Sequence, residues 1–153
     1  HFEFVPVNRL YSSISLNDNL HTGVSYFRAE VLRIKAVANA IAEGFRVVAI
    51  MDEPFKGTNV KDAFDASLAV LKRLESKHHC LFIFSSHLIE LDDHFGSSTN
   101  IRRCHFEAQE SEGQLQFDYQ LQPGVSHQRL GMRVLAEERV FELLDRPTNS
   151  TTI

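Results

Sequence analysis

The chain has 153 residues, of which 43% are hydrophobic and 24% are charged, and its formal net charge is -4. This composition is typical of one globular domain. Sixteen Lys and Arg against 20 Asp and Glu leave no basic excess to neutralise a phosphate backbone, which argues against nucleic-acid binding by this segment alone. No apolar run approaches the roughly 20 residues that span a bilayer, and the first residues lack the basic and apolar regions of a signal peptide. We therefore expect a cytoplasmic protein without a membrane span.

The N-terminal part of the chain predicts two short strands and one helix. Residues 2–5 and 9–14 are rich in β-forming side chains, and a proline at position 6 separates them. After a polar loop, apolar residues recur at alternating spacings of four and three, the period of an amphipathic helix. These residues are Phe27, Val31, Ile34, Ala38 and Ile41. Gly44 is placed to end that helix as a C-terminal cap.

The middle of the chain predicts a strand, a helix and a second strand. Residues 47–51 form a short continuous apolar run, the pattern of a parallel strand covered on both faces, and residues 80–84 repeat it. Residues 60–76 between them have helical periodicity. This order predicts a right-handed βαβ unit, in which ligands bind at the loops after the strand carboxyl ends. Those loops are residues 52–59 and 85–88.

The last third predicts an antiparallel hairpin followed by helices. Apolar and polar residues alternate from 115 to 121, so we expect residues 101–108 to pair with residues 115–121 across a turn near 112–113. A Pro-Gly break then leads to apolar spacings that predict a helical tail. The predicted fold class is α/β: a mainly parallel sheet with flanking helices, an antiparallel hairpin and C-terminal helices.

An acidic pair, Asp52 and Glu53, ends the first of the two apolar strands. An aspartate at a strand tip can hold Mg²⁺ through water, while an adjacent carboxylate polarises an attacking water. An acidic pair that caps a helix is the alternative interpretation. Gly57, Thr58 and Asn59 supply a tight turn and polar groups directly afterwards, which favours a nucleotide site.

His87 follows the second apolar strand and should emerge beside the acidic pair. A histidine in that place can hydrogen-bond a terminal phosphate. The alternative is a histidine at the start of a helix with no ligand.

A polar loop that contains Gly23 and Ser25 runs straight into the first predicted helix. Backbone N–H groups and a serine at a helix N-terminus are well placed to bind an anion. An ordinary N-cap explains Ser25 equally well.

One nucleotide-binding motif is missing from the sequence. A GxxxxGK[ST] phosphate loop requires lysine directly after glycine, and none of the five lysines follows one. We therefore expect the isolated chain to be inactive towards ATP, and a nucleotide enzyme that contains it to carry its phosphate loop elsewhere.

Taken in order along the chain, these motifs resemble the C-terminal half of the ATPase domain of the MutS family, which acts in DNA mismatch repair. Residues 18–30 are similar to the family's signature D-D-L-x-x-G-x-S-T-F-x-x-E. Residues 47–53 resemble its Walker B strand, residues 57–59 its D-loop and residues 86–91 its T-H-Y-x-E-L switch. The resemblance implies a partial domain of the P-loop NTPase-like, ABC-class fold over residues 1–145. The residues after it, 146–153, are expected to form a flexible tail.

The resemblance also implies roles in ATP hydrolysis. Asp52 would support Mg²⁺, Glu53 would orient or activate the hydrolytic water, and His87 would sense the γ-phosphate. ATP and Mg²⁺ would bind only in the complete protein.

Four further residues are implied to act at a dimer interface. Gly23 and Ser25 would reach the nucleotide of the opposite subunit of a homodimer, and Thr58 and Asn59 would link the two sites. ATP binding and hydrolysis would switch a clamp on mismatched or branched DNA, which regions outside this chain would hold.

The sequence departs from the family pattern at Pro54, Tyr26 and Asn59, which indicates a divergent MutS-like branch. Two other functions stay open. One is a non-catalytic dimerisation or interaction module, in which the acidic pair and His87 only maintain the fold. The other is a different ABC-class ATPase of DNA maintenance. A phosphate loop upstream would favour an ATPase, and its absence would favour the module.

Overall fold

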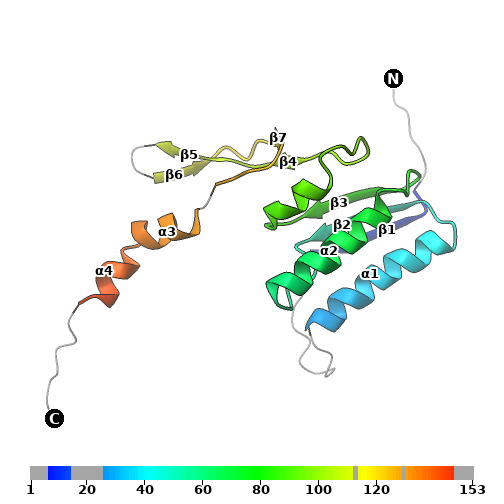
Figure 1. The fold of residues 1–153 in the computed structure, drawn as a ribbon, viewed down its shortest axis with the longest axis horizontal. Coiled ribbons are helices and arrows are strands. Elements are labelled where there is room, and N and C mark those ends of the chain that lie inside the picture. Colours follow the sequence, from blue (N-terminus) through cyan, green and yellow to red (C-terminus); the bar gives the residue numbers. More distant parts are fainter. Residues whose placement is uncertain (1–6, 15–25, 112–113, 129, 147–153) are drawn as a thin grey trace, which may run out of the picture. The chain divides into compact units, whose positions relative to one another are not determined.

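The chain divides into two compact units, one up to Ile101 and one from Arg102 onwards (Figure 1). The computed structural model describes residues 7–14, 26–111, 114–128 and 130–146. The first unit contains a parallel sheet with helices, and the second contains short antiparallel ladders and two short helices. The predicted α/β class is confirmed in this coarse form. In the described part of the chain, the helices are too short or too polar to span a bilayer.

Three parallel strands form the sheet of the first unit, in the order β1-β2-β3. They are β1 (Arg9–Ser13), β2 (Val47–Asp52) and β3 (Leu81–Ser85). The predicted strand-helix-strand unit is confirmed, because β2 and β3 are parallel neighbours. Both strands run one residue further than the apolar pattern indicated. Asp52 and Ser85 are therefore register partners at the carboxyl ends of neighbouring strands.

Two helices, α1 (Tyr26–Ala42) and α2 (Val60–Leu74), lie against one face of this sheet (Figure 1). Because the strands follow one another in spatial order and each crossover is right-handed, both helices lie on the same side. The chain leaves α1 through Gly44, whose φ of 85° is left-handed and whose N–H donates to the carbonyl of Ile41. The predicted glycine cap is confirmed.

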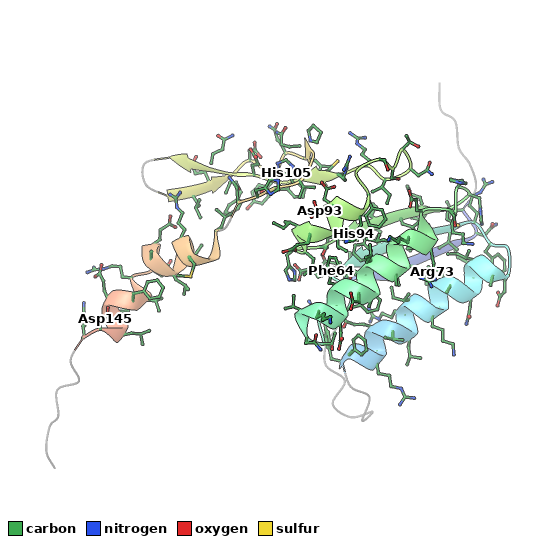
Figure 2. All side chains as sticks on the ribbon, in the orientation of Figure 1. Phe64, Arg73, Asp93, His94, His105 and Asp145 are labelled. Atoms are coloured by element: carbon green, nitrogen blue, oxygen red, sulfur yellow. The ribbon has the colours of Figure 1, made fainter. Side chains whose placement is uncertain are left out.

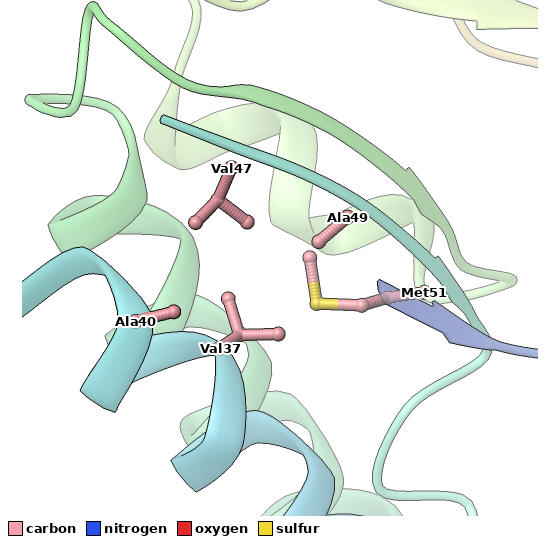
Figure 3. Packing of buried hydrophobic residues seen from close by; sticks show 5 residues of the cluster. All are labelled: Val37, Ala40, Val47, Ala49 and Met51. Atoms are coloured by element: carbon pink, nitrogen blue, oxygen red, sulfur yellow. The ribbon is translucent and has the colours of Figure 1, made fainter. Parts of the chain in front are cut away.

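The core of the first unit lies between α1 and the middle strand (Figure 3). Alternate residues of β2 point towards the helices, as the pleat of a strand requires. Five side chains, each at most 4% exposed, make up this core: Val37, Ala40, Val47, Ala49 and Met51.

The buried face of α1 differs slightly from the predicted one. Val31 and Ala38 are exposed, whereas their neighbours Glu30 and Val37 are buried. The apolar pattern did not select Glu30 because a carboxylate is costly to bury without partners. Here the partner is the backbone of the segment after β2, where the N–H of Gly57 donates to the Glu30 carboxylate over 3.1 Å.

The prediction that the apolar strands are covered on both faces is wrong for the described residues. On the face opposite the helices, Leu10, Leu81 and Ile83 are 71%, 59% and 54% exposed. Both crossover helices lie on the other face, so the sheet of this unit has only one layer of helices against it.

The predicted hairpin of the second unit consists of two separate antiparallel ladders. β4 (Cys104–His105) pairs with β7 (Gln122–Pro123), and β5 (Ala108–Ser111) pairs with β6 (Gln114–Phe117). Between the ladders, residues 106–107 oppose residues 118–121, and the left-handed φ of 55° at Tyr119 accommodates this bulge. The predicted turn near 112–113 lies outside the described residues.

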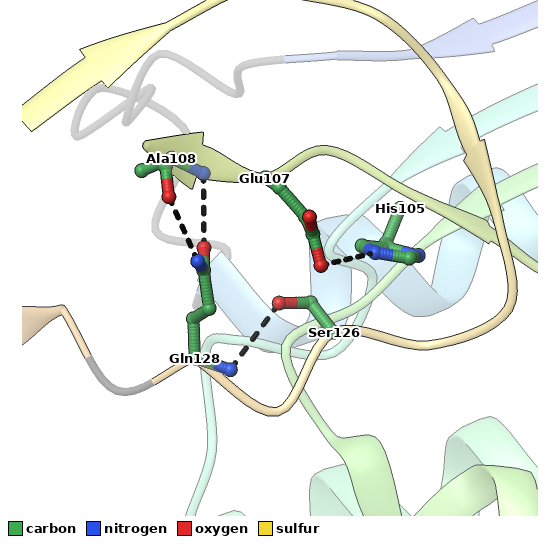
Figure 4. Close-up of polar contacts among 5 residues, drawn as sticks. All are labelled: His105, Glu107, Ala108, Ser126 and Gln128. Atoms are coloured by element: carbon green, nitrogen blue, oxygen red, sulfur yellow. Dashed lines mark hydrogen bonds and ion pairs between the residues drawn. The ribbon is translucent and has the colours of Figure 1, made fainter. Parts of the chain in front are cut away.

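Gln128 joins the strands to the following segment (Figure 4). Its side-chain amide accepts the N–H of Ala108 over 2.9 Å and donates to the carbonyl of the same residue over 2.8 Å. The predicted helical tail is confirmed as α3 (Gly131–Glu137) and α4 (Val140–Leu144), neither of which buries a residue. The predicted frayed tail lies outside the described residues, except for Arg146.

Candidate functional site

A serine joins the carboxyl ends of β2 and β3. The hydroxyl of Ser85 donates to the Asp52 carboxylate over 2.5 Å and accepts the N–H of Glu53 over 3.0 Å. One side chain therefore orients both residues of the acidic pair. Sequence reasoning treated Ser85 only as part of a loop. The signal that identifies it is its register, because parallel neighbours bring Asp52 and Ser85 opposite each other.

Glu53 and His87 lie close together at the same edge of the sheet. Nδ1 of His87 is 3.4 Å from Oε1 of Glu53, and the two side chains are 66% and 42% exposed. The expected position of His87 beside the acidic pair is thus confirmed. A contact this exposed contributes little stability, so its significance lies in the open arrangement of a carboxylate and an imidazole.

The segment after His87 is anchored on α2. His87 is followed by η2, a short 3-10 helix (Ile89–His94), in which Leu91 is buried. The ring of His94 packs against the ring of Phe64 on α2, with centroids 5.7 Å apart (Figure 2). These contacts hold the backbone on one side of His87, while β3 holds it on the other.

The segment after β2, residues 53–58, has an unusual backbone. We call it the β2–α2 loop. Glu53 and Phe55 have left-handed φ values of 43° and 71°, which cost of order 1–3 kcal/mol each in a non-glycine residue. Between them, Pro54 is buried, and Phe55 is only 3% exposed. The ring of Phe55 packs against Phe27 of α1, with centroids 6.2 Å apart. Packing therefore fixes a backbone that is locally unfavourable.

The first turns of α1 press closely on this loop. A Cβ added to Gly57 would lie 2.4 Å from Cδ1 of Tyr26 and 2.9 Å from the backbone nitrogen of Phe27. Burial raises the pKa of Glu30, and the N–H groups of Gly57, Lys56 and Phe55 oppose that rise. Only glycine fits at position 57, because helix and loop backbones approach each other there.

Lys56 places a cation beside the acidic pair. A hydrogen bond with the Tyr26 hydroxyl is the main cause that raises the pKa of Lys56, and the charges of Glu53 and Asp52 raise it further. Lys56 is therefore protonated at neutral pH. Two departures from the family signature therefore lie close in the structure, because Tyr26 contacts Lys56 in the loop that also contains Pro54.

Asn59 caps α2, which tests the alternative interpretation of the acidic pair as a helix cap. Its side chain accepts the N–H of Asp62 over 2.9 Å and donates to the Asp62 carboxylate over 2.6 Å, as an N-cap of α2 does. The cap of α2 is therefore Asn59, and the interpretation of Asp52 and Glu53 as helix-capping residues is wrong. Thr58, directly before it, is half-buried.

The remaining candidates, Gly23 and Ser25, lie outside the described residues. Within the described part of the chain, no group of three or more His, Cys, Asp or Glu side chains is placed to hold a metal ion. The site consists of Asp52, Glu53, Ser85 and His87, with Lys56 beside the acidic pair.

Comparisons with known proteins agree on one family. The family model of MutS domain V matches residues 1–144. The chain is similar to the DNA mismatch repair protein MutS of Natronomonas pharaonis, with 27% identity over 85% of this chain and 15% of that protein. It is also similar to the DNA mismatch repair protein MutS of Rhodopseudomonas palustris, with 27% identity over 84% of this chain and 14% of that protein. The chain thus spans about one seventh of the length of these curated relatives.

Proposed function

Because the chain belongs to the MutS family, we propose that it forms the C-terminal part of an ATPase domain in a longer protein, called the parent protein below. The parent protein would hydrolyse ATP to switch a clamp on mismatched or branched DNA. The observation that carries the proposal is the open acidic edge, where Asp52, Glu53, Ser85 and His87 converge. Ligands of parallel α/β sheets bind outside the strand carboxyl ends, where this edge lies.

Mg²⁺ fits the residues at this edge. The Asp52 carboxylate is exposed and held by one hydroxyl donor, so a second oxygen is available to a cation or its water. Mg²⁺ is usually bound through one or two carboxylates, several waters and substrate phosphates rather than by a protein cage. The lack of a three-ligand cluster among the described residues suits such an ion. When bound, Mg²⁺ neutralises charge on the phosphates.

Glu53 and His87 would have different roles at the edge, one towards the attacking water and one towards the phosphate. The Glu53 carboxylate would accept a proton from the attacking water, because its backbone is fixed by Ser85 while its side chain is half-exposed. Nδ1 of His87 contacts Glu53, and the imidazole ring would hydrogen-bond the terminal phosphate. In the homodimer, Gly23 and Ser25 of one subunit would reach the nucleotide of the other.

ATP hydrolysis by the parent protein and by the 153-residue chain tests this function. We expect turnover by the parent protein and none above background by the chain, because no lysine in the chain follows a glycine to form a phosphate loop. A parent protein that binds no nucleotide would instead favour the non-catalytic interaction module.

Replacing Ser85 with alanine should lower kcat of the parent protein by about tenfold, since misplaced catalytic groups lose one to two orders of magnitude in rate. The change removes the donor to Asp52 and the acceptor of the Glu53 N–H. Ser98→Ala is a matched control, because the Ser98 hydroxyl also accepts one backbone N–H, that of Asn100. Equal kcat values for the two variants would mean that Ser85 does not orient the acidic pair.

A further inference from the structure

We propose that Glu30 of α1 is a positioning residue, whose buried carboxylate holds the backbone N–H groups of the β2–α2 loop and so fixes Glu53 at its start. The role rests on the ATPase function proposed above, because it concerns the loop that carries the catalytic carboxylate. The contacts of Glu30 are with the backbone of the loop, so it would act through the loop.

Glu30 contacts the backbone N–H groups of the loop, whereas Tyr26 and Phe27 of α1 contact loop side chains. The side chain is 4% exposed and projects from the helix into the loop, where it accepts the N–H of Gly57 over 3.1 Å. The N–H groups of Lys56 and Phe55 also face it. Successive N–H groups of a turn converge into an anion-binding concavity, and here the anion is a carboxylate of the same chain. Lys56 is the charged side chain of the loop that acts on Glu30.

Two locally unfavourable features meet at this contact. One is the buried carboxylate, which is costly to bury without hydrogen-bond partners. The other is the backbone of the loop, with left-handed φ at both Glu53 and Phe55. Features of this kind collect at functional sites, where geometry is retained at the expense of stability.

The same loop leads directly from Glu30 to the acidic pair. Three residues separate Gly57 from Glu53, and two of the three, Pro54 and Phe55, are buried. The N–H of Glu53 is fixed at the other end by Ser85. The loop is therefore held at both ends and has little freedom between them. Releasing the Glu30 end should change the direction of the Glu53 side chain without disturbing β2.

The experiment uses the parent protein with two substitutions of Glu30. Glu30→Gln keeps one acceptor oxygen for Gly57 but removes the charge, and Glu30→Met keeps the volume but removes the acceptor. We expect kcat to fall by about 10-fold to 100-fold in Glu30→Met, less in Glu30→Gln, with KM for ATP little changed. Backbone amide exchange over residues 53–58 should become faster in the same order. Since burial raises the pKa of Glu30, the ionised form disfavours folding, and Glu30→Gln should unfold at no lower temperature.

Glu43→Gln is the matched control, because Glu43 is exposed just after α1 and should change none of these quantities. The proposal is overturned if Glu30→Met or Glu30→Gln keeps full kcat, or if amide exchange in the loop is unchanged. If Glu30→Met does not fold, Glu30→Gln alone decides by the same two measurements. Glu53→Gln, measured in parallel, separates the two proposals. If that variant keeps its turnover, the ATPase role of the acidic pair fails, whereas amide exchange still reports whether Glu30 holds the loop.

Discussion

Replacing Glu53 with glutamine should lower kcat for ATP hydrolysis by the parent protein about 100-fold or more, the size of a typical general-base contribution. The carboxamide has nearly the same shape, but it accepts no proton from water. The backbone contact of Glu53 with Ser85 runs through the N–H, so the substitution leaves it intact. We therefore expect ATP binding to survive while turnover is lost, as measured by equilibrium binding and phosphate release.

The control for this prediction is a carboxylate elsewhere on the same unit. Glu43→Gln makes the same chemical change at an exposed position after α1 and should leave kcat unaltered. If Glu53→Gln turns over ATP at the rate of the unaltered protein, Glu53 is not the base. If both ATP binding and turnover are lost, Glu53 supports the nucleotide rather than the water.

The parallel sheet was predictable from sequence because its signals are local. A continuous apolar run marks β2, a helical period marks α2, and Gly44 marks the end of α1. The pattern did not predict that helices cover only one face of the sheet. Periodicity reports that a strand is apolar on both faces, but only strand order and crossover handedness decide where the helices lie. Leu81 and Ile83 are exposed for that reason.

The candidate site was predicted only where local strand patterns place its residues. The position of His87 beside Glu53 follows from the carboxyl ends of two parallel neighbours, which a strand pattern can place. The roles of Ser85 and Glu30 were not predicted, although Glu30 ends the signature-like segment, because these roles depend on contacts between segments distant in sequence. Ser85 contacts residues more than 30 positions away, and Glu30 contacts Gly57, 27 positions away. No local period indicates such contacts.

The second unit shows the limit of period-two patterns. Alternation between residues 115 and 121 correctly indicated antiparallel pairing, but it did not reveal a bulge at residues 118–121. The bulge depends on a left-handed Tyr119 and on the Asp118 carboxylate, which accepts the N–H of Gln120 over 2.8 Å. An aspartate that bonds backbone two residues on is a turn signal. Recognising that signal inside an alternating run would have divided the hairpin correctly.

Replacing Met51 with alanine should reduce the free energy of unfolding of the chain by about 2–5 kcal/mol, the range for a large-to-small change in a packed core. Met51 is 2% exposed, lies between Ser13 and Phe84 in the sheet register and packs against α1. This loss of stability has two parts: the transfer free energy of the buried atoms that are removed, and the cost of the cavity left behind. Urea unfolding of the 153-residue chain, followed by far-ultraviolet circular dichroism, measures it.

The chain supplies a matched control, because it has only two methionines. Met132 lies in α3 and is 66% exposed, so Met132→Ala removes the same atoms where water already surrounds them. Its cost should be within about 0.5 kcal/mol, as for ordinary surface substitutions. The core around Met51 contains few fully buried side chains, and the opposite face of the sheet is open. A single core methionine therefore carries a large share of the stability of this unit. Equal costs at the two positions would show that the interface between β2 and α1 is not what holds the sheet together.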